Sequence, residues 1–280
     1  MYLATKERSA RSSFAERISS GDVEAHWLID RERGGARQGK IGLIEIGAGG
    51  TASLMPEAND EDMVFVLRGH GAARLDGRTA DIRDEQVIFI PAGNSLELQA
   101  RDDGLQLLLV HGGSGNVAGL GGGRASPAIA AQPIAKPLIT RLDQIEYGAV
   151  HKPDLGFLHV AARWLVSAAA SKSNSLVIGQ STFVRDAAHL LHKHDHADEF
   201  FYVFEGEGAH LVEGGEIAMK TGDVVFAPRG EWHGFRNRND RPVRAIFGYF
   251  GVAVLEDAGY EIHEATKLAR VEVVPTSCPA

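Results

Sequence analysis

The sequence repeats itself at a constant offset of 137 residues, as from Asp62 to Glu199, and this repeat limits the possible fold more than any other feature. Many of the matching positions are glycines and prolines, which mark turns for steric reasons. The other matched pairs are Val66 and Val203, Gly69 and Gly206, Gly71 and Gly208, Val87 and Val224, Phe89 and Phe226, Pro91 and Pro228, and Gly93 and Gly230. The repeat favours duplication of one domain over two unrelated domains with similar turns.

Short apolar runs, separated by glycine and turn residues, make up both halves of the chain. The first runs are at 41–46 and 63–67, and the last is at 243–249. Their spacing of about 8 to 12 residues is typical of an all-β sandwich or barrel. Helical periodicity of convincing length appears nowhere in the chain. The sequence therefore predicts an all-β protein with one β domain in each half.

The same pattern divides the chain into four parts. Residues 1–38 are polar, and we expect them to form an N-terminal arm before a first barrel at 39–111. Residues 112–136 contain seven glycines between Gly112 and Gly123 and then two prolines, a composition typical of a linker. Residues 137–280 are expected to form the second barrel.

Composition excludes several classes of protein. The net charge is −8 and no basic run stands out, which argues against a nucleic-acid partner. No apolar run approaches the 18 or so residues of a membrane span, and the first residues lack the apolar core of a secretory signal. The one cysteine, Cys278, excludes a disulfide framework and a cysteine-rich zinc site. We expect a cytoplasmic protein.

Four histidines lie within eight residues of the second half: His189, His192, His194 and His196. Alternate side chains of a strand face the same way, so His192 and His194 project together. Glu199 follows before an apolar run, and His233 follows a turn much later. Three imidazoles and one carboxylate suit a divalent transition metal, namely Fe, Mn, Ni, Cu, Co or Zn. An octahedral ion would keep two positions open for substrate or O₂.

These segments resemble the two motifs of the cupin superfamily. The first motif, H-x-H-x4-E-x6-G, is filled by His192, His194, Glu199 and Gly206. The second, G-x5-P-x-G-x2-H-x3-N, is filled by Gly222, Pro228, Gly230, His233 and Asn237. One departure is Asp186, at a position where glycine is often found. With the repeat, the resemblance covers residues 41–110 and about 160–250. It implies two tandem jelly-roll barrels, with His192, His194, Glu199 and His233 as ligands of one metal inside the second barrel.

The first copy lacks this ligand set. At the offset of 137, the ligand positions are occupied by Met55, Glu57, Asp62 and Leu96, none of which is a histidine. We therefore expect the first barrel to be structural, with one metal per chain. In the second copy His196 also keeps the alternate spacing, but the strand must turn before Glu199, so we expect His196 at the rim. His189 is out of phase with His192 and is expected at the surface or the rim.

Strand alternation also predicts which side chains line the second barrel. The predicted pocket residues are Thr182, Val184, Leu190, Phe201, Val203, His210, Phe235 and Tyr249. Such an apolar and aromatic wall fits a small organic molecule of modest polarity, although barrel interiors contain such residues whatever their function. Arg163, Arg185 and Arg229 could pair with a substrate carboxylate at the mouth, or serve only as solvated surface residues.

The resemblance implies metal-dependent chemistry. Metal-bearing cupins with two barrels include flavonol and gentisate-type dioxygenases, so we favour Fe(II) and an oxidoreductase of the dioxygenase type acting on a small aromatic or enolic substrate. A redox-neutral isomerase, lyase or hydrolase is an alternative, because ureidoglycine aminohydrolases resemble this layout with metal in the second barrel only. A non-catalytic protein that binds a metal or a ligand is a third possibility. Cupins commonly dimerise, which implies a homodimer.

Overall fold

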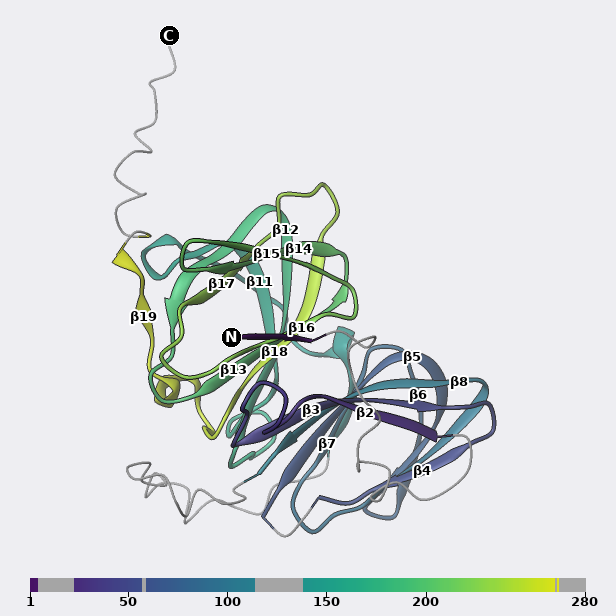
Figure 1. Ribbon diagram of the computed structural model, residues 1–280. Coiled ribbons are helices and arrows are strands. Elements are labelled where there is room, and N and C mark those ends of the chain that lie inside the picture. The colour runs from purple at the N-terminus through teal and green to yellow at the C-terminus, as the bar shows by residue number, and fades with distance from the viewer. Residues whose placement is uncertain (5–22, 57–58, 114–137, 265, 267–280) are drawn as a thin grey trace.

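The computed structural model describes residues 1–4, 23–56, 59–113, 138–264 and 266. These residues form two antiparallel sheets, each curled on itself, that pack side by side (Figure 1). The helical segments described are short 3-10 turns, η4 (Leu142–Gln144), η5 (Pro153–Leu155) and η6 (Leu255–Ala258). The prediction of an all-β protein is confirmed. Within the described residues, no helix has the length and apolar character that crossing a membrane requires.

The first sheet forms a barrel that is filled with apolar side chains. Its strands are β2 (Val23–Ile29), β3 (Gly39–Ile46), β4 (Thr51–Leu54), β5 (Glu61–Leu75), β6 (Arg78–Arg83), β7 (Gln86–Ile90), β8 (Leu96–Gly112) and β9 (Leu138–Arg141). They follow the order β2-β3-β8-β5-β7-β9, with β4 on β8 and β6 on β5. Val64, Ile88, Leu96 and Leu107 are among the fully buried residues of its interior. Close packing of these side chains makes this barrel a solid core.

The second sheet is larger. Its strands are β1 (Tyr2–Ala4), β10 (Gly148–Lys152), β11 (Phe157–Val166), β12 (Leu176–Lys193), β13 (Asp198–Glu205), β14 (Glu207–Val212), β15 (Gly215–Lys220), β16 (Val224–Ala227), β17 (His233–Arg236), β18 (Val243–Phe250) and β19 (Glu261–Ile262). The main path is β1-β16-β13-β18-β12-β17-β14-β15, with β11 and β19 on β12 and β10 on β11. Strands β12 and β17 are antiparallel neighbours in this sheet.

The sequence repeat is reproduced in the strand register. Strands β5 and β7 pair Asp62 with Ile90, and strands β13 and β16 pair Glu199 with Ala227. Both residues of the second pair lie 137 positions after those of the first. Because a one-residue slip would turn every side chain to the opposite face, equal registers mean that equivalent residues face equivalent sides. The register supports duplication of one domain.

Strand pairing crosses the boundaries expected from the sequence. Strand β2 lies within the expected arm at 1–38 but pairs with β3 of the first sheet. Strand β9 follows the glycine-rich segment but pairs with β7, while β1 pairs with β16 of the second sheet. Each of these segments covers an edge whose backbone groups would otherwise lack partners. Residues 114–136, most of the expected linker, lie outside the described part of the chain.

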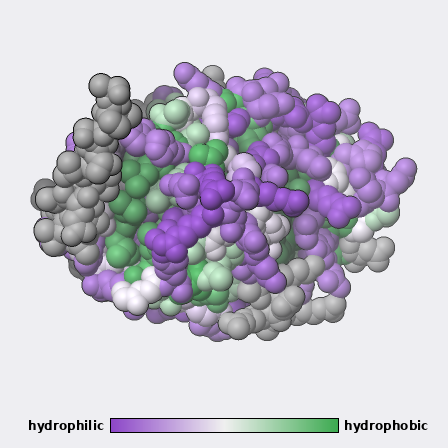
Figure 2. Space-filling view, turned by 90° about the horizontal axis from the view of Figure 1, so that it is seen from above, coloured by the Kyte–Doolittle hydropathy of each residue, from purple (hydrophilic) through white to green (hydrophobic). Residues whose placement is uncertain are grey.

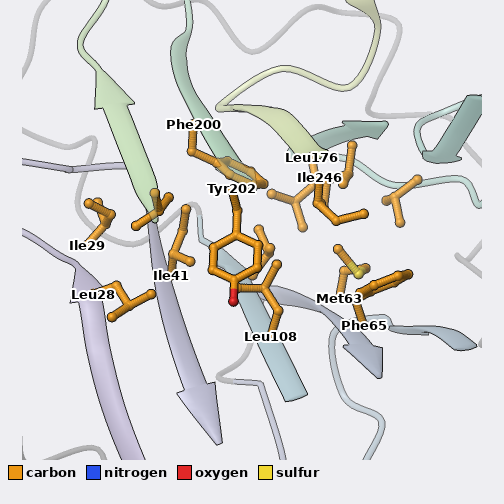
Figure 3. Close-up of a cluster of buried hydrophobic side chains, with 14 of the residues drawn as sticks. Leu28, Ile29, Ile41, Met63, Phe65, Leu108, Leu176, Phe200, Tyr202 and Ile246 are labelled. Atoms are coloured by element: carbon orange, nitrogen blue, oxygen red, sulfur yellow. The ribbon is translucent and has the colours of Figure 1, made fainter. Parts of the chain in front are cut away.

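An apolar core joins the two barrels. Phe200 and Tyr202 of β13 project into it and share one buried cluster with Ile41, Phe65 and Leu108 of the first sheet (Figure 3). Phe201 lies between them in sequence and faces the opposite side, into the second barrel. Strand β13 is therefore buried on both faces, one against the first barrel and one against the interior of its own barrel.

A buried carboxylate adds a polar link across the same interface. Glu61 of β5 accepts hydrogen bonds from the hydroxyl groups of Ser173 (2.6 Å) and Ser175 (3.0 Å), just before β12. The backbone N–H groups of Asn174 and Ser175 also donate to it, at 3.0 and 3.2 Å. Glu61 is 2% exposed, so water does not replace these donors. The carboxylate therefore holds the loop that begins the second barrel against the first.

Gly206, the last residue of the first motif, is expected to tolerate no side chain. Its φ is +89°, and a Cβ there would lie 2.6 Å from the carbonyl oxygen of Pro242. Gly214 is a matched control, because its φ is +80° but a Cβ would meet nothing within 4 Å. We expect Gly214→Ala to lower the free energy of unfolding by about 1 kcal/mol and Gly206→Ala by about 3 kcal/mol. Urea unfolding measures both; equal losses would contradict the proposed clash.

Candidate metal centre

The structure brings together the four residues that the sequence singled out. His192 is near the end of β12 and His194 directly follows that strand, Glu199 is in β13, and His233 begins β17. All four are buried, and one possible ligand atom from each lies within 4.8 Å of the others. Among the described residues, no other group of three or more histidine, cysteine or acidic side chains has this geometry.

The carboxylate of Glu199 lies at the centre of the group. Its Oε2 atom is 2.8 Å from Nε2 of His233, 3.1 Å from Nε2 of His194 and 3.8 Å from Nε2 of His192. All three imidazoles therefore present the same nitrogen to the same point. His192 and His194 lie two residues apart, and β17 pairs with β12 so that His233 lies directly opposite His192; this strand pairing brings the third ring to the other two.

Backbone carbonyls fix the orientation of each ring. Nδ1 of His192 lies 2.8 Å from the carbonyl oxygen of Leu190, Nδ1 of His194 lies 2.7 Å from that of Gly259, and Nδ1 of His233 lies 2.7 Å from that of Glu231. A carbonyl oxygen only accepts, so each Nδ1 carries a proton and donates it. A neutral ring then has a lone pair at Nε2, the usual arrangement of a metal-binding histidine.

Two of the three Nε2 atoms lack a hydrogen-bond partner among the described residues. Those of His192 and His194 are buried without a hydrogen-bond partner, and the nearest oxygen belongs to a carboxylate, which has no proton to donate. Buried polar atoms without partners are uncommon in proteins. Three imidazole nitrogens and one carboxylate are a donor set suited to a divalent first-row metal. The residues present therefore fit a divalent metal ion.

The electrostatics of the group keep the carboxylate charged. Burial alone would raise the pKa of Glu199, but the surrounding histidines hold that pKa well below its usual range. Burial, with a contribution from His233, lowers the pKa of His192 to about 4. Burial also opposes a charge on His233, but the carboxylate outweighs burial and raises its pKa. At neutral pH the site thus offers an anionic oxygen beside an uncharged His192.

A cavity of about 540 Å³ lies against the four residues. A row of aromatic rings leads into it: Trp164 contacts Phe247 with ring centres 5.6 Å apart, Phe247 contacts Tyr249 at 6.1 Å, and Tyr249 contacts His194 at 4.8 Å. Trp164 is 40% exposed and Tyr249 is buried, so the row runs from the surface to the metal centre. Figure 2 shows apolar areas between the hydrophilic side chains on the face of the molecule seen from above.

Four predicted pocket residues lie on the cavity wall: Phe201, His210, Phe235 and Tyr249. His210 is 3% exposed, and burial together with the nearby His233 lowers its pKa to about 3. The other four predicted residues do not line the cavity. Val203 packs in the apolar interior of the barrel, and Leu190 contributes its carbonyl group to His192 rather than its side chain to the wall.

Thr182 and Val184 differ from prediction because the alternation of β12 changes phase. Ser181 and Phe183 line the cavity in their place, whereas Val184 is 46% exposed. Ala187 in the barrel interior and His189 on the cavity keep the phase of Ser181 and Phe183, and the register between β12 and β17 shifts between His189 and His192. Such an irregularity inserts a residue into the alternating pattern. Counting back by twos from His192 therefore selects the wrong face of the strand.

Sequence reasoning also missed part of the cavity mouth. His189, expected at the surface or the rim, is half-buried, and its ring stacks on that of His192 with centres 3.6 Å apart. Its Nε2 lies 3.1 Å from the hydroxyl group of Tyr260, and Phe157 stacks on its other face at 3.9 Å. Tyr260 lies far along the chain, and nothing in its sequence context signals this contact. His196 is exposed, outside the group of four.

The three arginines considered as carboxylate-binding residues have other contacts. Arg185 pairs with Asp240 at the surface, and Arg163 donates to the carbonyl oxygen of Leu142. Arg229 binds Asp198 and Gln38. No arginine is among the described residues that line the cavity, and Lys152 is the one lysine there.

The corresponding positions of the first barrel hold a different arrangement. Leu96, which corresponds to His233, is fully buried in the apolar interior. Asp62, which corresponds to Glu199, lies 2.6 Å from Nδ1 of His111. Met55 is 67% exposed. Residue 57 lies outside the described part of the chain. The first barrel therefore has a buried aspartate–histidine pair where the second has the group of four.

Comparison with known proteins places these observations in a family. Residues 182–249 match the family model described as Cupin domain. The chain is 29% identical over 69 residues to the tetracenomycin polyketide synthase protein TcmJ of Streptomyces glaucescens, a match covering 25% of this chain and 46% of that protein. It is 40% identical over 47 residues to an oxalate-binding protein of Thermotoga maritima, covering 17% of this chain and 39% of that protein. The matches thus span less than half of either relative.

The likeness to solved structures extends over both barrels. Oxalate decarboxylase OxdC of Bacillus subtilis superposes with a TM-score of 0.66 at 14% identity, covering 98% of this chain and 85% of that chain. At this identity the likeness concerns the fold alone, and it includes the tandem arrangement of two jelly-roll barrels. The two sequence motifs and the family model agree that residues 182–249 are a cupin domain, and the chain as a whole has the two-barrel fold of the oxalate decarboxylases.

Proposed function

We propose that His192, His194, Glu199 and His233 bind one divalent transition metal per chain, and that Fe(II) is the functional ion. The observation that carries this proposal is the convergence of three Nε2 atoms on one buried carboxylate, with all three Nδ1 atoms held by carbonyl groups. Four protein ligands leave two positions of an octahedral ion free. The Mn(II) centres of oxalate decarboxylase OxdC support a divalent first-row ion in this fold.

The volume and the aromatic lining of the cavity favour an enzyme that acts on a small aromatic or enolic molecule. Its volume of about 540 Å³ is in the range of small-molecule sites. Phe183, Phe201 and Phe235 pack against one another along the wall, with ring centres 4.5–5.9 Å apart. A small dianion would lose its hydration in such a pocket, and apart from the proposed metal ion Lys152 is the one lysine or arginine among the described lining residues that could compensate. An uncharged ring or an enol fits this wall better.

The residues of the second barrel suit oxygen chemistry on such a substrate. When bound, the metal would supply a site for O₂ and for a substrate oxygen. Phe201 and Phe235 would hold the substrate against the metal centre and exclude water, which limits side reactions. The hydroxyl group of Tyr249, whose ring contacts His194, can donate a hydrogen bond to a bound oxygen atom. We therefore propose an oxidoreductase of the dioxygenase type.

A redox-neutral reaction is the second candidate. The two-barrel fold is shared with oxalate decarboxylases, and the donor set that suits O₂ would also polarise a carbonyl or enol oxygen. An isomerase, lyase or hydrolase would use the same cavity without O₂. The homodimer and the cytoplasmic location expected from the sequence stay predictions.

Oxygen consumption should separate the two candidates. Protein loaded with Fe(II) under nitrogen is mixed with small phenols, catechols, β-diketones and enols, and oxygen uptake is followed after admission of air. We expect uptake with at least one class of compound, in proportion to its consumption, and no turnover before air is admitted. The His196→Ala variant, changed outside the group of four, should behave like the unmodified protein. Turnover at the same rate under nitrogen would assign the protein to the redox-neutral class.

A further inference from the structure

His210 is a buried polar side chain without a partner on the wall of the cavity. It is 3% exposed, and neither Nδ1 nor Nε2 has a hydrogen-bond partner among the described residues. Strand β14 places it opposite Phe235 of β17, and its ring lies parallel to that of His233, with an angle of 2° and centres 6.2 Å apart. His210 thus lines the same cavity as the metal centre without belonging to the group of four.

The packing of the barrel does not account for a histidine at this position. The neighbouring interior residues are apolar, Phe183, Phe201 and Phe235 among them, and an apolar ring would fill the same space. Burying a polar group without a hydrogen bond destabilises the folded state. A histidine here is therefore unfavourable for stability, and an interaction with a molecule that enters the cavity would offset that cost.

We propose that His210 binds an oxygen substituent of the organic ligand and so selects ligands that carry a hydroxyl or carbonyl group on the face turned toward β14. This inference rests on the proposed function, because it concerns the ligand of the same cavity. A neutral imidazole has one donor and one acceptor nitrogen, which match a carbonyl and a hydroxyl group. Since one oxygen would bind the metal, the substrate class is an aromatic or enolic compound with at least two oxygen substituents.

Ser181 marks a second polar point on the same wall. Its hydroxyl oxygen is buried and has no hydrogen-bond partner among the described residues, and Ser181 lines the cavity. It lies on β12, whereas His210 lies on β14, so the two groups face the ligand from different strands. Apart from the metal centre, the buried wall thus offers isolated hydrogen-bonding groups rather than a charged cluster, which favours hydroxyl and carbonyl groups over carboxylates.

The test compares 2-naphthol with naphthalene, two probes of nearly equal shape that differ by one hydroxyl group. Dissociation constants are measured by fluorescence titration of the full chain after metal removal, so that the hydroxyl group has no metal to bind. Removing the hydrogen bond in His210→Phe should lower the preference for 2-naphthol over naphthalene roughly three- to tenfold. His210→Gln keeps a donor and an acceptor and should retain part of the preference. His196→Phe, changed at an exposed histidine, should retain all of it.

Thermal unfolding separates a ligand-binding role from a structural one. Because His210 has no partner to lose, its replacement by phenylalanine should leave the unfolding midpoint unchanged or raise it. An unchanged preference for 2-naphthol in a folded His210→Phe variant would overturn the proposal, and so would an equal loss of affinity for both probes. A lowered midpoint for both His210→Phe and His210→Gln would show a structural role and overturn it as well. The binding assay uses protein without metal. If the purified protein contained no metal, that finding would contradict the proposed function, but it would not change the result for the His210 variants.

Discussion

Replacing His194 with alanine should remove the metal from the protein. The variant keeps two imidazoles and one carboxylate, and the carbonyl oxygen of Gly259 loses the Nδ1–H donor that orients the ring. Loss of a hydrogen-bonding partner of a ligand alone costs roughly 10–100-fold in metal affinity. We therefore expect loss of the ligand itself to lower the affinity more than about 100-fold. Elemental analysis after dialysis should give about one metal per chain for the unmodified protein and nearly none for the variant.

His196→Ala is the matched control for this experiment. His196 lies two residues after His194, but its side chain is exposed and outside the group of four. Its removal should leave the metal content unchanged. Equal metal loss in both variants would show that the assigned ligand set is wrong, and so would full retention of metal by His194→Ala.

Replacing Glu61 with alanine should strongly destabilise the contact between the barrels. The carboxylate accepts hydrogen bonds from two serine hydroxyl groups and from backbone N–H groups of residues 174 and 175. Removal of Glu61 would take this acceptor from the buried donors of Ser173 and Ser175 and from the partly buried N–H of Asn174, at a cost of about 1–3 kcal/mol for each buried donor that does not find water. We expect a loss of at least about 3 kcal/mol in the free energy of unfolding, seen as a lower urea midpoint.

A variant at a second glutamate tests whether the expected loss of stability in Glu61→Ala depends on burial of the carboxylate. Glu97 pairs with Arg74 at the surface, with both side chains about half exposed. Exposed ion pairs contribute about 0–1 kcal/mol, so Glu97→Ala should shift the urea midpoint little. If both variants lost the same stability, the hydrogen bonds of Glu61 would not hold the barrels together.

The sequence alone determined the features that depend on local spacing. Short apolar runs between turn residues predicted an all-β chain, and turn glycines at a constant offset predicted the duplication that the equal strand registers support. The spacing of His192, His194, Glu199 and His233 indicated the group that the structure brings together. On β13 and β17, alternation also placed Phe201 and Phe235 on the cavity wall, because no irregularity separates them from Glu199 and His233.

Only the tertiary structure decided the features that depend on distant segments or on a break in a strand. The irregularity between His189 and His192 reverses the phase of β12, so Ser181 and Phe183 line the cavity instead of Thr182 and Val184. Strands β1, β2 and β9 each pair with a strand beyond the boundary expected from the sequence. Each of them pairs along the edge of a sheet, and the amino-acid composition of a strand does not specify which edge it will join. Tyr260 reaches His189 from another part of the chain. Spacing along a regular strand sets which way neighbouring side chains point, but folding of the whole chain sets which strands meet.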